Sequence, residues 1–165
     1  MEHNYSFEFN GLEFKPFTSE GSELYRQLRN KPENIICFKT KKEISVDEQN
    51  NWYNAYLKRE NDFMFAVYCK GEFIGAAAVY DVDFEDKSAE FGRILIGTKG
   101  KGYGKMTTDA MSFFSKNELG LKKLKLDVYC DNKAAYETYL KCGYETCGET
   151  YDLNNRKMYL MVKEL

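Results

Sequence analysis

Residues 89–106 read AEFGRILIGTKGKGYGKM and join an apolar, strand-like run to a loop in which glycine and lysine alternate. The loop residues of interest are Lys99, Gly100, Lys101, Gly102, Tyr103, Gly104 and Lys105. Glycines let successive backbone N–H groups turn toward one point, and a helix that begins near Tyr103 would add its positive end. The pattern predicts a cradle for an anion such as a pyrophosphate, with lysines supplying further charge. A flexible turn with solvated lysines has the same composition and remains the alternative.

Two well-known phosphate motifs do not fit this loop. A P-loop requires GxxxxGK[ST], but Lys99 stands at the first glycine position and Met106 at the final hydroxyl position. The dinucleotide fingerprint GxGxxG, started at Gly100, reaches Lys105 where a third glycine is required. The loop is therefore neither of these two nucleotide-binding motifs.

The remaining sequence predicts a single domain over residues 1–165 with an α/β fold, that is, a mixed α+β sheet. About seven strands are expected, at residues 12–18, 62–69, 72–84, 89–97, 121–130, 144–151 and 156–165. Four helices are expected, at residues 21–30, 45–60, 103–120 and 132–143. Hairpins imply antiparallel pairs, whereas a helix between strands implies a parallel crossover, so one mixed sheet with helices on both faces follows.

Composition and charge exclude several classes of partner. The chain has 24 basic and 26 acidic side chains. Its net charge of −2 therefore gives no reason to expect binding to nucleic acid or to an anionic membrane. No apolar run approaches the ~20 residues of a membrane span, and the N-terminus does not resemble a signal peptide. We therefore expect a soluble, cytoplasmic protein; the sequence is compatible with a homodimer but does not determine the oligomeric state.

Cysteine and histidine limit the chemistry. The five cysteines are scattered without a CxxC pair, which suits a reducing compartment, and we expect small buried side chains at Cys37, Cys69, Cys130, Cys142 and Cys147. The single histidine, His3, is expected in a loose terminus. A Ser/His or Cys/His nucleophile is therefore not expected, and no metal site is expected either.

Two segments together resemble a known family. KGKGYG at residues 99–104 is similar to the R/Q-x-x-G-x-G/A signature of the GNAT N-acetyltransferase superfamily, with lysine at its first position. NKAAYETYLKCGY at residues 132–144 resembles the family pattern N-x-x-A-x-x-x-Y-x-x-x-G-[FY]. The resemblance implies acetyl-CoA as cosubstrate, no metal, and a parallel splay between the fourth and fifth strands. It also implies that the glycine loop binds the pyrophosphate of acetyl-CoA.

Acetyl transfer to an amine needs a base, because only the neutral amine attacks the thioester. Removing the proton from an alkyl ammonium at pH 7 costs about 4.6 kcal/mol. Strand alternation places Glu90 on one face with Gly92, Ile94 and Ile96. In several family members a glutamate at this place acts as base, directly or through water, so the resemblance supports Glu90. A structural ion pair of Glu90 with a neighbouring Arg or Lys is the alternative.

The resemblance gives Tyr139 the role of acid toward the departing thiolate, although a core tyrosine would show the same helical spacing. It also implies that freed amides of the strand before the loop, at Ile94, Leu95 and Ile96, meet the pantetheine arm. Asn132 is expected to contact the same arm, but a plain helix cap would look identical in sequence.

The acceptor is predicted from a second resemblance and from a group of lysines. Residues 28–34, 45–56 and 89–97 look like the branch with ribosomal-protein N-terminal acetyltransferases and amino-sugar acetyltransferases of nucleotide-sugar pathways. A nucleotide-linked amino sugar is our first choice, because its amine is less basic and its diphosphate suits the lysines of residues 39–42; these lysines also fit a solvated patch. A peptide N-terminus or a polyamine is the alternative acceptor. A module that binds acyl-CoA without catalysis is the alternative class.

Overall fold

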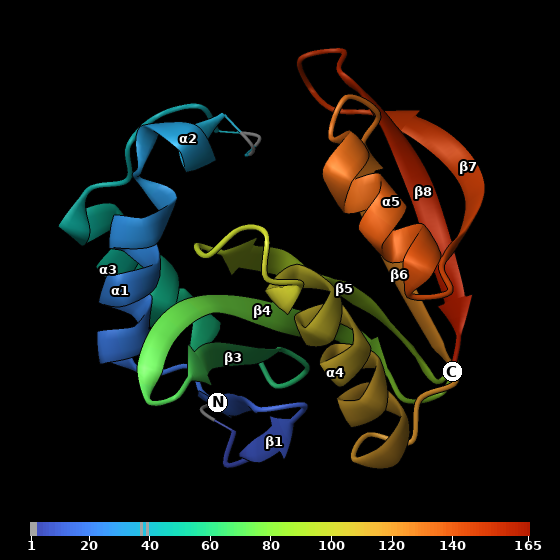
Figure 1. Ribbon diagram of the computed structural model, residues 1–165, viewed down its shortest axis with the longest axis horizontal. Coiled ribbons are helices and arrows are strands. Elements are labelled where there is room, and N and C mark those ends of the chain that lie inside the picture. Colours follow the sequence, from blue (N-terminus) through green and yellow to red (C-terminus); the bar gives the residue numbers. More distant parts are fainter. Residues whose placement is uncertain (1–2, 37, 39) are drawn as a thin grey trace.

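The computed structural model describes residues 3–36, 38 and 40–165, and over these residues it has eight strands in one sheet and five helices (Figure 1). The strands are β1 (Phe7–Phe9), β2 (Leu12–Pro16), β3 (Phe63–Cys69), β4 (Glu72–Asp83), β5 (Ser88–Ile96), β6 (Lys123–Tyr129), β7 (Glu145–Tyr151) and β8 (Lys157–Glu164). The helices are α1 (Ser19–Arg29), α2 (Pro32–Ile35), α3 (Val46–Tyr56), α4 (Tyr103–Asn117) and α5 (Lys133–Lys141).

The predicted mixed sheet is confirmed, with two short elements added. β1 has three residues and folds back on β2 through a turn at Asn10 and Gly11, whose φ angles are 49° and 81°. α2 is a single turn that starts at Pro32, between the first two expected helices. Both elements are shorter than the windows over which hydrophobic periodicity is visible, so sequence periodicity could not reveal them.

The sheet order is β1-β2-β3-β4-β5-β6-β8-β7, and α4 carries the chain across from β5 to the parallel strand β6. The structure describes every residue of β5 and β6. The pairing between these two strands covers three positions and ends at Glu90 opposite Lys125. β6 then continues along β8 as far as Tyr129, while β5 continues along β4 to Ile96. The two strands therefore separate after Glu90, as the predicted splay requires.

Helices cover both faces of the sheet. One core cluster, which includes Phe65, Phe91 and Phe114, lies beneath α4 and α5. The second, which includes Phe17 and Tyr56, lies beneath α1 and α3 on the opposite face (Figure 1). The buried side chains of the central strands therefore pack against one of two different helical layers, according to their direction.

A β-bulge in β5 changes which residues share a face. Between the pairs Ala76↔Leu95 and Ala78↔Gly92, β4 advances two residues while β5 advances three, and Arg93 has φ 50°. The expected alternation is therefore wrong beyond Gly92, because the extra residue reverses the direction of every later side chain. Ile94 and Ile96 pack with Phe91 on the α4 side, whereas Leu95 lies with Glu90 and Gly92 on the α1 side.

The N-terminus is not loose at His3. This side chain is 7 % exposed, its Nε2 lies 2.8 Å from the carbonyl oxygen of Met64, and its ring is 4.5 Å from that of Phe65. The expectation failed because contacts with the distant strand β3 order this residue, and no local pattern reveals them.

The cysteine expectation was correct for Cys142, which is buried. It was wrong for Cys147, which is exposed on the edge strand β7, while Cys69 and Cys130 are half-buried. Cys37 and Lys39 lie outside the described residues. Across the described part of the chain, no helix has the length and apolar character needed to cross a membrane.

Candidate active site

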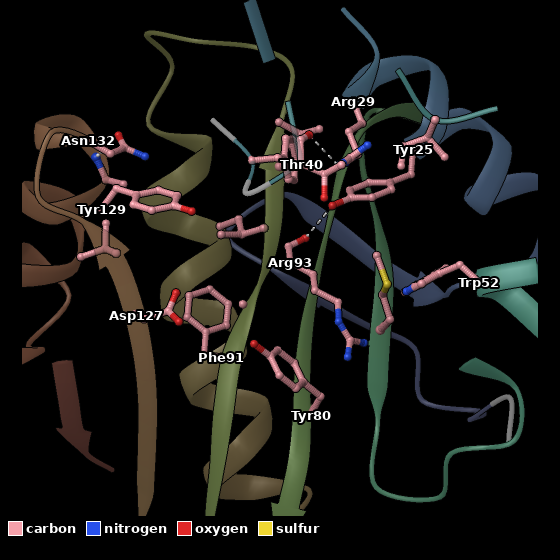
Figure 2. Close-up of a pocket in the computed structure, with 18 of the residues that line it drawn as sticks. Tyr25, Arg29, Thr40, Trp52, Tyr80, Phe91, Arg93, Asp127, Tyr129 and Asn132 are labelled. Carbon is pink, nitrogen blue, oxygen red and sulfur yellow. Dashed lines mark hydrogen bonds between the residues drawn. The ribbon is translucent and has the colours of Figure 1, made fainter. Parts of the chain in front are cut away.

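A cavity of about 530 Å³ lies where β5 and β6 separate, and residues from both faces of the sheet line it (Figure 2). On one side are α1 and α3 with Tyr25, Arg29 and Trp52. On the other side is α5 with Ala135 and Tyr139. The splay thus connects the two layers of the molecule through the sheet.

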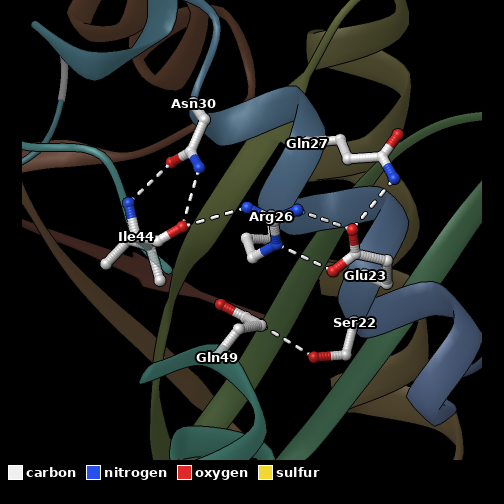
Figure 3. Close-up of polar contacts among 7 residues, drawn as sticks. All are labelled: Ser22, Glu23, Arg26, Gln27, Asn30, Ile44 and Gln49. Atoms are coloured by element: carbon white, nitrogen blue, oxygen red, sulfur yellow. Dashed lines mark hydrogen bonds and ion pairs between the residues drawn. The ribbon is translucent and has the colours of Figure 1, made fainter. Parts of the chain in front are cut away.

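The walls of this cavity are fixed by polar contacts between α1 and the chain around α3 (Figure 3). The Asn30 side chain donates to the carbonyl of Ile44 at 2.8 Å and accepts from its N–H at 2.9 Å. Arg26 donates to the same carbonyl at 3.1 Å, and Gln49 on α3 donates to Ser22 at 2.8 Å. Ser45 and Glu48 form a capping box at the start of α3.

Four of the residues chosen from the sequence line the cavity: Ile94, Leu95, Asn132 and Tyr139. Glu90, Ile96 and the glycine loop, residues 99–105, lie outside its wall. The expected acid and three of the residues expected to contact pantetheine therefore lie around one cavity. The expected base stands one residue before Phe91, which does line the cavity.

Glu90 is half-buried between Tyr80 on β4 and Lys125 on β6, its register partners. Burial raises the pKa of this carboxyl, Lys125 opposes the rise, and Asp127 adds to it. The Lys125 ammonium contacts Ser88 at 3.2 Å and Asp86 at 3.8 Å, and within the described residues Glu90 has no ion pair. A carboxylate with a raised pKa and no bound cation is chemically suited to accept a proton.

Tyr139 projects from α5 and is 8 % exposed. Its ring meets that of Phe91 edge-on at 6.2 Å and lies 5.8 Å from Tyr144. Burial raises the pKa of the Tyr139 phenol well above its ordinary value. The phenol therefore stays protonated at neutral pH, which is the form that can donate a proton.

Asn132 caps α5 and also lines the cavity, while its contact with the pantetheine arm stays a prediction. Its Oδ1 accepts from the N–H of Ala135 at 3.3 Å and so caps α5, while the residue also lines the cavity. The cap occupies the oxygen, so the amide NH₂ is the part of this side chain with capacity to donate to a ligand.

The glycine loop has left-handed backbone at two glycines and leads directly into α4. Gly100 and Gly102 have φ angles of 78° and 75°, and Gly102 is the N-cap of α4. The first turn of α4 holds no acidic residue, so nothing there competes with a bound anion. Lys105 pairs with Asp109 at 2.6 Å, which raises the pKa of the ammonium and engages it locally.

Several cavity residues were missed in the sequence because they come from separate elements. Arg93 donates to both carboxylate oxygens of the buried Asp62 at 2.7 Å, and its guanidinium lies 4.2 Å from the Tyr80 ring and 5.8 Å from that of Trp52. Asp127 also lines the cavity from β6. No local motif marks these side chains, although the single tryptophan of the chain could have been noticed.

The described residues contain no group of three or more His, Cys, Asp or Glu side chains that could hold a metal ion. The chemistry derived above instead uses a carboxylate, a phenol and backbone amides. These groups suit acyl transfer, in which a proton leaves an amine and another reaches the leaving group.

Comparisons with known proteins agree with this arrangement. A family model described as an acetyltransferase (GNAT) domain matches residues 12–145. The chain is 24% identical over 142 residues to spermidine N(1)-acetyltransferase of Escherichia coli strain K12, covering 85% of this chain and 76% of that protein.

Two solved structures are also similar. One is spermidine N-acetyltransferase from Vibrio cholerae in complex with CoA and spermine, with a TM-score of 0.83, 22% identity, and 93% and 95% of the two chains covered. A chimeric variant of the Vibrio cholerae enzyme has a TM-score of 0.84 at 20% identity, covering 94% of this chain and 96% of the other. The chain therefore belongs to the GNAT acetyltransferase family, and it is an N-acetyltransferase that takes its acetyl group from acetyl-CoA.

Proposed function

We propose that this enzyme acetylates a primary amine of a small molecule by direct transfer, with both substrates bound at once. The observation that carries the proposal is the cavity that passes through the splay between β5 and β6. Acetyl-CoA extends from the glycine loop along the separated edge of β5, and the amine enters from the side of α1 and α3. The two substrates meet beside Phe91 and Tyr139.

In the proposed reaction, Glu90 removes a proton from the acceptor ammonium through water, since its carboxylate lies outside the cavity wall. The neutral nitrogen then attacks the thioester carbonyl carbon, and backbone N–H groups of Ile94–Ile96 stabilise the charge on the carbonyl oxygen. As the carbon–sulfur bond breaks, Tyr139 gives its phenolic proton to the departing thiolate. The nitrogen, which became positively charged when the carbon–nitrogen bond formed, loses its second proton to the Tyr139 phenolate through water, so that a neutral amide, CoA and the phenol result. Asn132 helps to hold the pantetheine arm.

The comparisons support a polyamine acceptor better than our first choice, a nucleotide-linked amino sugar, because the similar proteins are spermidine N-acetyltransferases. The carboxylates of Glu90 and Asp127 also suit an ammonium group. A second class, amines that also carry an anionic group, is favoured by Arg29, a buried cation in the cavity wall whose Nη1 has no hydrogen-bond partner among the described residues. The cytoplasm remains the location that we propose.

The test is mass spectrometry of the purified protein with acetyl-CoA and a pool of primary amines that includes polyamines, amino sugars, their phosphates and nucleotide conjugates, and short peptides. We expect stoichiometric release of CoA and one class of product heavier by an acetyl group. Tight binding of acetyl-CoA without any product would contradict the proposal and favour a non-catalytic acyl-CoA-binding module.

A further inference from the structure

Arg29, the last residue of α1, is a buried cation in the cavity wall. It is 9 % exposed, and its guanidinium lies 4.5 Å from the ring of Phe38. Nη2 donates to the carbonyl oxygen of Thr40 at 3.4 Å, as Figure 2 shows. Nη1 is buried without a hydrogen-bond partner among the described residues. A guanidinium has five N–H donors, so this one has unused capacity.

The charge of Arg29 is also not neutralised by an ion pair within the described part of the chain. Tyr25 and Glu48 favour its charged form, but burial outweighs them and lowers the pKa of the guanidinium. The Glu48 carboxylate is instead paired with Lys42 at 2.6 Å. Because an unpaired buried charge is destabilising, a residue of this kind is expected to have a partner that the protein alone does not supply.

Arg93 shows the contrast within the same cavity. Its guanidinium donates to both carboxylate oxygens of Asp62 at 2.7 Å, so its charge is balanced by the protein. The two carboxylates nearest the splay, Glu90 and Asp127, lie on β5 and β6, away from α1. The cavity thus has the Asp127 carboxylate at the splay, with Glu90 just outside its wall. On the side of α1 and α3 it has the Arg29 cation and the Glu48 carboxylate, which is paired with Lys42.

We propose that Arg29 binds an anionic group, a phosphate or a carboxylate, on the amine acceptor. This inference rests on the proposed function, since it assigns the remote end of the same substrate. A guanidinium matches either anion with two parallel N–H···O bonds and is less strongly hydrated than an ammonium. A polyamine would instead bring a second ammonium toward Arg29, which costs electrostatic energy in a partly desolvated site.

The test compares amines that differ only in the remote group: aminohexanol, aminohexanoate and aminohexyl phosphate, together with glucosamine, its phosphate, and spermidine. In the wild-type enzyme we expect the anionic member of each set to have a KM about tenfold or more below that of its neutral partner. The relative KM of carboxylate and phosphate identifies the source of the anion. Preference for spermidine over every anionic amine would overturn the inference.

Substitution separates a specificity role from a structural one. Arg29→Gln should raise the KM for the anionic amine about tenfold, with kcat and the KM for acetyl-CoA little changed, and Arg29→Lys should restore part of the affinity. Lys31→Gln is the matched control. Lys31 is two residues from Arg29 and carries the same charge, but its side chain is exposed and lies outside the cavity. A change confined to the KM for acetyl-CoA would show that Arg29 binds the cofactor and would refute the inference.

Binding keeps the inference testable if no amine is acetylated and the proposed function fails. Calorimetric titration of the wild-type protein with aminohexyl phosphate, in the presence of CoA, should then still show binding that Arg29→Gln abolishes. Absence of binding to the wild-type protein would overturn the anion subsite independently of turnover.

Discussion

The ring of Tyr80 packs directly over Gly92: a Cβ at this glycine would lie 2.9 Å from the Tyr80 hydroxyl oxygen and 3.2 Å from Cε1. Arg93 also restricts the Tyr80 ring, because its guanidinium lies 4.2 Å from the ring centre. Gly92 therefore provides the space that lets Tyr80 line the cavity.

Gly92→Ala should displace Tyr80 and lower kcat/KM for the acceptor by about tenfold or more, since small misplacements in a site are costly. Steady-state kinetics with both substrates measure this effect. Gly148→Ala, on β7, is the control, because its Cβ would meet Cδ1 of Leu160 on β8 at an ordinary 3.6 Å. Equal kinetics for the two variants would show that the packing of Tyr80 is irrelevant to turnover.

Glu90→Gln should lower kcat at neutral pH, with partial recovery at high pH, where the acceptor amine loses its proton unaided. A pH–rate profile of the variant tests this. If that profile matched the wild type, Glu90 would have a structural role.

The same substitution should not reduce stability. Because burial raises the pKa of Glu90 above its unfolded value, the stability it contributes is present below the unfolded pKa and is lost as pH rises through the folded pKa. Glu90→Gln should therefore have a Tm at pH 8 equal to or above the wild type, with the difference shrinking toward pH 4. A markedly lower Tm at pH 8 would mean that the carboxylate is held by favourable contacts.

Tyr139→Phe should reduce kcat by about 100-fold while the Kd for acetyl-CoA changes little, because the ring still packs against Phe91 and only the proton donor is lost. Rapid-quench kinetics and calorimetry measure the two quantities separately. Tyr136→Phe is a suitable comparison, since its hydroxyl lies 3.1 Å from Thr146 and outside the cavity wall. Unchanged turnover in Tyr139→Phe would remove this residue from the mechanism.

Asp62→Ala should lower the free energy of unfolding by about 2–3 kcal/mol, because it removes two charged hydrogen bonds and leaves Arg93 without its carboxylate. Urea denaturation measures the loss. Arg59→Ala removes the longer contact to the same Asp62, at 3.2 Å and from a half-exposed side chain, and should cost less than about 1 kcal/mol. Similar losses in the two variants would contradict the importance assigned to Arg93.

Gly102→Ala should weaken acetyl-CoA binding, because a φ of 75° costs an alanine about 1–2 kcal/mol and the loop will relax away from its cradle. Gly11→Ala is the matched control: its φ is 81°, nothing lies near its Cβ, and it is in the β1–β2 turn far along the sheet from β5. Both variants should lose similar stability, but only Gly102→Ala should raise the Kd. An unchanged Kd would separate the loop from cofactor binding.

The order of elements and the glycine loop were predictable because their signals are local. The Lys70–Gly71 turn has φ angles of 52° and 79°, as a tight hairpin requires, and α4 starts at Tyr103, where the loop predicted it. The parallel pairing of β5 with β6 also followed from one helix lying between two strands.

The parts that could not be predicted depend on contacts between distant segments. The bulge at Arg93 leaves no mark in the alternation of apolar residues, so the faces of Ile94 and Ile96 were reversed. Arg29 looks like an ordinary last-turn cation of a helix until Phe38 and Thr40 cover it. Its burial exists only in the folded molecule.

The separation of β5 from β6 leaves the sheet with a place where one more extended chain could lie. An extended, amide-containing arm such as pantetheine has the shape of a missing strand, and the N–H groups along the free edge of β5 could pair with it as a neighbouring strand would. The cosubstrate would then be part of the architecture during the catalytic cycle. By mass action, the amount of acetyl-CoA present would set how firmly the two halves of the sheet are joined.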